Sequence, residues 1–190
     1  MGKKRTLSQY RTIDLILFAL MLTVFETIII KASTRWFPAQ PYTVSLAAAV
    51  TAIVMTRWGA WAGIHAALGG LVLCAASGAA PAQYAVYCGG NLFALLAIPV
   101  IRLLGGNEEV RSSSGKTVCF GAAVLLAMQL GRALISLLTG AELTAALGFF
   151  TTEVITDLFT LVILWIARRA DGLLEDQEHY LERIAREERG

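Results

Sequence analysis

The chain has 190 residues, of which 56% are apolar and only 16% are charged, and its formal net charge is +2. Its mean hydropathy is +0.63. This composition excludes an ordinary water-soluble globular domain and indicates a membrane protein. There is no basic stripe interleaved with aromatic residues, so we expect no nucleic-acid partner.

Six apolar stretches follow one another along the chain. The first two cover residues 13–30 and 43–56, and the last two cover residues 117–138 and 147–167. Between them, residues 58–101 carry no Asp, Glu, Lys or Arg and divide at the turn 77–81 into two further stretches. Because about 20 helical residues cross roughly 30 Å of hydrocarbon, we predict an all-α membrane domain over residues 1–169 with six transmembrane helices.

The connections indicate the orientation of this domain. Of the 16 Lys and Arg residues, 13 fall on the side that holds both termini, which the positive-inside rule places in the cytoplasm. Residues 105–115 are rich in Gly and Ser and predict a flexible cytoplasmic link. Residues 170–190 are charged, with apolar residues at roughly helical spacing, so we expect a cytoplasmic amphipathic helix; a solvated extension of the last span fits equally.

Four ionisable residues stand alone inside the apolar stretches, namely Glu26, Arg132, Glu153 and Asp157. A charge at the centre of a span costs about 2.5–3.5 kcal/mol on insertion scales, so each is a candidate for a functional site. The first three lie 15 or 16 residues from a basic residue on the cytoplasmic side. At 1.5 Å per residue they share a layer about 22–24 Å from that face.

Polar and aromatic residues extend this layer. Counting from Arg102 places Tyr87 in the same layer and Asn91 one turn lower, while Tyr84 shares their helix face. Five aromatic residues could form the rim of a pocket around this layer: Trp36, Phe37, Tyr42, Phe149 and Phe150. We predict an outward-facing pocket, and its surplus of carboxylates favours a ligand with an amine or several N–H donors.

An internal ion pair is the alternative interpretation of these charges. Arg132 could pair with Glu153 or with Glu26 and simply fix helix packing. The receptor hypothesis therefore requires a hollow that is reachable from outside.

Small residues recur at four-residue spacing in two stretches. They are Ala19 and Thr23 in the first stretch, and Ala62, Ala66 and Gly70 in the third. Such patterns let helix backbones approach closely in lipid. They predict either a docking face for a partner membrane protein or packing within the bundle.

Signatures of enzymes are missing from the sequence. It contains no GxSxG, HExxH or P-loop motif, and its three cysteines lack the spacing of a metal site. We therefore expect no catalysis, cofactor or metal.

The whole chain resembles the substrate-binding S components of energy-coupling factor (ECF) transporters. Besides the six predicted spans, two segments carry the resemblance: residues 37–42 (FPAQPY) and 57–66 (RWGAWAGIHA). Both look like a Gram-positive subfamily of S components without an assigned substrate. The resemblance implies capture of a vitamin-like or heterocyclic micronutrient at a bacterial cell membrane. It also implies a transmembrane coupling protein and two cytosolic ATPases as partners, with docking through an Ala-xxx-Ala face, here Ala19 and Thr23.

Two other functions fit the same sequence. The chain could be an ion-coupled secondary transporter that uses Glu153 and Asp157 as a relay. It could also be a membrane assembly or scaffold protein whose tail recruits a cytosolic partner.

Overall fold

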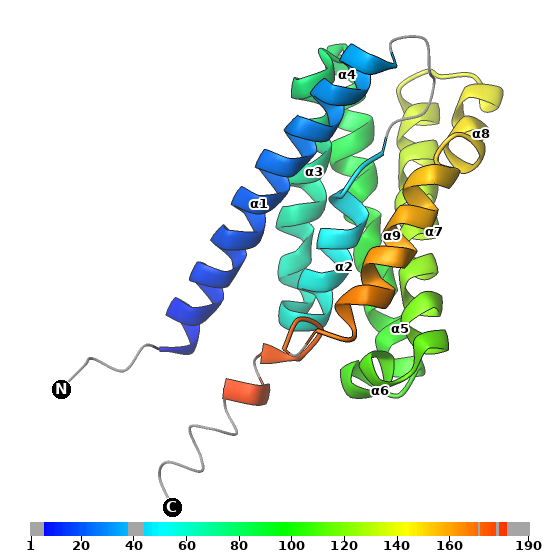
Figure 1. The fold of residues 1–190 in the computed structure, drawn as a ribbon. Helices are drawn as coiled ribbons and strands as arrows, with labels where there is room; N and C mark the ends of the chain where they lie inside the picture. The colour runs from blue at the N-terminus through cyan, green and yellow to red at the C-terminus, as the bar shows by residue number, and fades with distance from the viewer. Residues whose placement is uncertain (1–5, 38–43, 171, 178, 182–190) are drawn as a thin grey trace, which may run out of the picture.

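The computed structural model describes residues 6–37, 44–170, 172–177 and 179–181, and its regular elements there are helices packed side by side (Figure 1). The helices are α1 (Leu7–Trp36), α2 (Ala47–Trp58), α3 (Ala62–Ser77), α4 (Pro81–Tyr84), α5 (Ile98–Leu103), α6 (Asn107–Ser112), α7 (Ser114–Leu138), α8 (Leu143–Thr151) and α9 (Val154–Ala167). A 3₁₀ turn, η1 (Gly59–Trp61), joins α2 to α3, and the π turn η2 (Ala85–Gly89) and the 3₁₀ helix η3 (Leu92–Ala97) join α4 to α5.

Five helical stretches among the described residues are long and apolar enough to cross a membrane. They are Leu7–Trp36, Ala47–Ser77, Pro81–Leu103, Ser114–Leu138 and Leu143–Ala167. Many of their large apolar side chains, such as Leu17, Leu126 and Leu158, are exposed on the outside of the bundle, where lipid would cover them. The predicted all-helical membrane domain is confirmed at this level.

The stretch Ala47–Ser77 is a hairpin. The chain turns at Gly59, whose φ of +57° favours glycine. Arg57, at the end of α2, pairs with Asp14 near the start of α1. Ala47, at the start of α2, touches Gly69 in the middle of α3, where a Cβ on the glycine would lie 2.4 Å from the alanine Cβ. Helix α2 is therefore antiparallel to both α1 and α3.

The predicted flexible link at residues 105–115 is wrong. It contains α6, and Val110 on that helix is fully buried. The Thr117 hydroxyl donates to the Val110 carbonyl at 2.6 Å, and Lys116 bonds the Glu109 carboxylate at 2.7 Å and lowers its pKa. The buried Val110 side chain and these two contacts hold the segment in place, although its Gly- and Ser-rich composition predicted a flexible link.

After α9 the chain folds back onto the end of the bundle where α1 begins (Figure 1). Gly172, with φ +75°, permits the reversal, and Leu174 is buried in the core. Residues 172–175 form turns, and residues 177 and 179–181 are helical. The tail is thus not a straight extension of the last span, and most of the predicted amphipathic helix lies outside the described residues.

Candidate functional site

Arg132 is the centre of a polar cluster in the half of α7 farther from the termini. Its side chain is only 5% exposed. Its Nε donates to Asn91 Oδ1 at 2.7 Å, and its Nη1 donates to the Glu153 carboxylate. Its Cζ lies 5.1 Å from the ring centre of Tyr87, which is a cation–π distance. Four of the predicted site residues are therefore in one cluster.

Two glycines make this contact possible. A Cβ on Gly131 would lie 2.3 Å from the Gly90 carbonyl oxygen, and a Cβ on Gly90 would lie 2.6 Å from the Arg132 Cα. The backbones of α7 and of the segment around Asn91 therefore touch directly. This segment is irregular, because the π turn η2 ends at Gly89 and the 3₁₀ helix η3 begins at Leu92. π turns inside helices often occur at functional sites.

Glu153 lies at a break in the last helical stretch. Its backbone (φ −100°, ψ 11°) separates α8 from α9. Its carbonyl oxygen accepts a hydrogen bond from Asp157 N at 2.9 Å, in the first turn of α9. Asp157 accepts two hydrogen bonds from the Gln129 amide, at 3.0 and 2.9 Å. Helices α7 and α9 are thus joined by two polar pairs about a turn apart. Gln129 is uncharged and was not among the predicted site residues, although its spacing of three residues from Arg132 puts both on one helix face.

Glu26 has a different environment from the one predicted. It is fully buried, and its two oxygens accept hydrogen bonds from Ser45 Oγ and Leu46 N, both at 2.6 Å. These donors lie at the N-terminus of α2, which begins inside the bundle, where the first N–H groups of a helix have no acceptor within the helix itself. A carboxylate there stabilises the helix end and its dipole. Contact of Glu26 with a ligand stays a prediction, and its present partners give it a capping role.

The remaining predicted ligand contacts lie away from the Arg132 cluster. Trp36 is 73% exposed, and Tyr84 is half-buried on α4. Phe149 of α8 does reach the cluster, because its ring meets the Tyr87 ring edge-on at 6.0 Å. Tyr42, expected at the rim, lies outside the described residues.

A cavity adjoins the cluster, but it is small. Ser45, Gly69, Tyr87, Arg132 and Glu153 are among its lining residues, and its volume is ≈10 Å³. This is about the room needed by one water molecule. The Arg132–Glu153 pair of the alternative interpretation is formed, and this cavity beside it is far smaller than a ligand.

The predicted docking residues divide into two groups. Ala62, Ala66 and Gly70 lie inside the bundle, and a Cβ on Gly70 would lie 2.6 Å from the Tyr87 backbone. Their small size lets α3 approach the segment of Tyr87, so the structure assigns them to internal packing rather than to docking. Ala19 and Thr23 on α1 are partly exposed, and the Thr23 hydroxyl bonds the Ala19 carbonyl at 2.8 Å.

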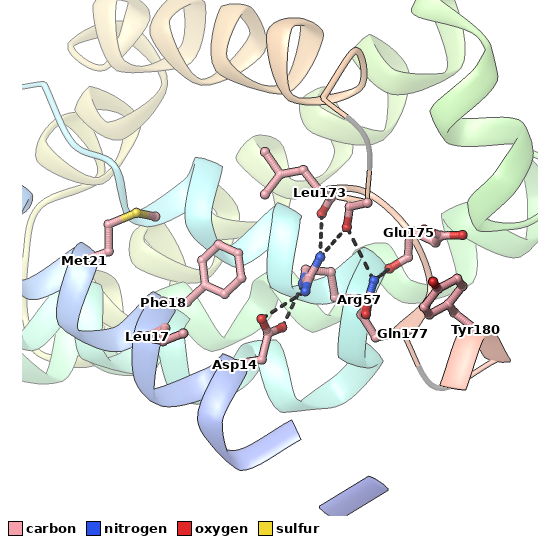
Figure 2. Close-up of a pocket in the computed structure, with 10 residues that line it drawn as sticks. Asp14, Leu17, Phe18, Met21, Arg57, Leu173, Glu175, Gln177 and Tyr180 are labelled. Atoms are coloured by element: carbon pink, nitrogen blue, oxygen red, sulfur yellow. Dashed lines mark hydrogen bonds and ion pairs between the residues drawn. The ribbon is translucent and has the colours of Figure 1, made fainter. Parts of the chain in front are cut away.

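A second polar network lies at the opposite end of the bundle (Figure 2). Arg57 bonds both oxygens of Asp14, at 2.8 and 2.9 Å, and donates to the Gly172 carbonyl of the tail. Trp58 Nε1 also donates to Asp14, at 2.5 Å. The network borders an open cavity of ≈560 Å³ between α1 and the tail. From the sequence, Arg57 counted among the basic residues of the cytoplasmic side and began the segment 57–66 of the resemblance, and its pairing with Asp14 was not predicted.

No protein-family model matches this chain, and no curated protein or solved structure matches it either. The fold and the buried cluster define a helical multi-pass membrane protein. A more specific function has to be inferred from the residues of the Arg132 cluster themselves.

Proposed function

We propose that this protein captures a small solute in a bacterial cell membrane, as the S component of an ECF transporter does. In this proposal the membrane domain crosses the bilayer six times, with both termini in the cytoplasm. The hairpin at Gly59 supports six crossings, because it splits one apolar stretch into two antiparallel helices. The start of α1 and the tail meet at one end of the bundle, and most of the Lys and Arg residues in the described part of the chain belong to that end.

The observation that carries the proposal is the buried guanidinium of Arg132, surrounded by groups from separate elements. Asn91 belongs to an irregular helical segment, and Glu153 lies at the break between α8 and α9. Transporters form their solute sites near the middle of the bilayer at broken helices of this kind. An ionisable residue inside a membrane is also expensive to keep unless it has a function.

Solute entry requires the cluster to open, since the cavity now holds about one water molecule. Helix α8 is the element suited to move. Among its residues only Ala146 is buried, and Leu143 and Leu147 are exposed. Rotation at Glu153 would withdraw Phe149 from Tyr87 and enlarge the space beside Arg132.

The resemblance to S components supplies the partners. We propose that a micronutrient enters from outside, and that a transmembrane coupling protein with two cytosolic ATPases drives its release. The chain itself is proposed to catalyse no reaction. Ala19 and Thr23 keep their proposed docking role, because they remain partly exposed on α1.

A purely structural membrane protein is the second candidate. It is favoured by the complete Arg132–Glu153 pair and by the small volume beside it. In that case the pair only fixes α7 against α9.

Mass spectrometry of small molecules extracted from the purified protein distinguishes the two candidates. The reference is the double variant R132M/E153L, since replacing a buried ion pair by apolar residues of similar volume often leaves stability unchanged. In each single variant the free energy of unfolding should fall by about 3–5 kcal/mol, because one buried charge is left without its partner. A capture protein carries a molecule that the folded double variant lacks. A structural protein carries none in either form.

A further inference from the structure

The charge balance around Arg132 differs from the one that the sequence indicated. Three carboxylates and one cation in the predicted pocket indicated surplus negative charge and a ligand with N–H donors. In the structure, however, Glu26 caps α2 and Asp157 is bonded by Gln129. The cavity wall itself carries one cation, Arg132, and one anion, Glu153, which form an ion pair. The site is therefore close to neutral.

One donor group of this pair is left over. Arg132 uses Nε for Asn91 and Nη1 for Glu153, whereas Nη2 meets no hydrogen-bond acceptor among the described residues. The side chain is nevertheless 95% buried and lines the cavity. Nη2 carries two N–H donors, and it is not among the described side-chain atoms that are both fully buried and unpaired, so it keeps accessible surface beside the cavity. The site therefore lacks an oxygen acceptor rather than a cation.

Aromatic rings stand beside this donor. Tyr87 lies under the guanidinium, and Phe149 meets Tyr87 edge-on with an interplanar angle of 80°. A planar ring could stack or pack edge-on against these two side chains as α8 moves aside.

We propose that the captured solute is an uncharged planar compound that presents a carbonyl or amide oxygen to Nη2 of Arg132. This inference rests on the proposed function and specifies its substrate class. An ammonium group would be repelled by Arg132 and would have to separate it from Glu153. A carboxylate would satisfy Nη2 but would add a second anion beside Glu153 at low dielectric, which is costly. A neutral acceptor satisfies Nη2 and leaves the ion pair intact.

Three probes with the same ring test the charge preference: benzamide, benzoate and benzylamine. We expect the purified wild-type protein at pH 7 to bind benzamide at least about tenfold more tightly than the other two, measured by calorimetry in detergent micelles. The inference is overturned if benzoate or benzylamine binds best, or if benzamide does not bind at millimolar concentration.

The matched variant is Arg132→Lys, which keeps the charge for Glu153 and removes Nη2. It should lose about tenfold or more in benzamide affinity, as expected for a hydrogen bond from a charged donor. Unchanged affinity would overturn the inference. Thermal unfolding without probe verifies that the variant is folded, and R132M/E153L provides a second form that lacks the donor.

Failure of this inference can be told apart from failure of the proposed function. If the wild-type protein carries a charged amine or acid from the cell, capture stands and the substrate class is wrong. If it carries no molecule that R132M/E153L lacks, the capture function itself is wrong.

Discussion

Replacement of Gly131 by alanine is expected to disrupt both the fold and the Arg132 cluster. The new Cβ would lie 2.3 Å from the Gly90 carbonyl oxygen and 2.6 Å from Cγ of Phe93. Ordinary contacts are about 3.5–4.0 Å, so α7 and its neighbour must separate by roughly 1 Å. Overpacking of this kind costs about 1–3 kcal/mol, and a backbone oxygen cannot rotate away as a side chain can.

The same displacement reaches the site, because Arg132 follows Gly131 directly. Its Nε–Oδ1 distance to Asn91, now 2.7 Å, would rise beyond hydrogen-bond range. We therefore expect a lower unfolding temperature together with loss of benzamide binding. Both are measured on purified protein by differential scanning fluorimetry and calorimetry.

Gly148→Ala is the matched control. Gly148 also lies in a helix, but nothing approaches within 4 Å of its added Cβ. Alanine there should stabilise the protein by about 0.5–1 kcal/mol through its higher helix propensity. If Gly131→Ala unfolds at the wild-type temperature, the close approach of the two backbones is refuted.

Two further predictions concern the other polar groups. Arg57→Lys should release the tail, because lysine cannot bond both Asp14 oxygens and the Gly172 carbonyl at once. Limited proteolysis should then cleave the tail several times faster than in the wild-type protein. The control Arg102→Lys, at an exposed position, should leave the cleavage rate unchanged. Glu26→Gln should destabilise the fold by about 1–3 kcal/mol, since an amide offers only one acceptor oxygen for the two donors at the start of α2. The control is Glu142→Gln on an exposed residue, and equal thermal unfolding of the two variants would contradict the capping role of Glu26.

The depth of each polar residue could be predicted from sequence, because the rise of a helix per residue is fixed. Counting from basic residues placed Tyr87, Arg132 and Glu153 in one layer and Asn91 one turn lower, and the four side chains meet in the structure. Depth does not determine the direction in which a side chain points, so it could not show that Asp157 faces Gln129 while Glu153 faces Arg132.

The role of Glu26 was hidden for a different reason. Nothing in the apolar stretch 43–56 indicates that α2 starts only at Ala47, inside the bundle. The small residues of α3 were ambiguous because the same pattern serves internal and external contacts. Only the positions of Gly70 and Tyr87 in space resolve it.

The π turn η2 has a consequence for how this chain tolerates changes in length. A π turn holds one residue more than a regular helical turn, so everything after it is rotated by about 100° relative to an uninterrupted helix. Asn91 lies two residues after the turn and owes its aim at Arg132 to this offset. Deletion of Val86 or of Cys88 would straighten the helix and swing the amide away from the guanidinium, even though every side chain that touches Arg132 would still be encoded.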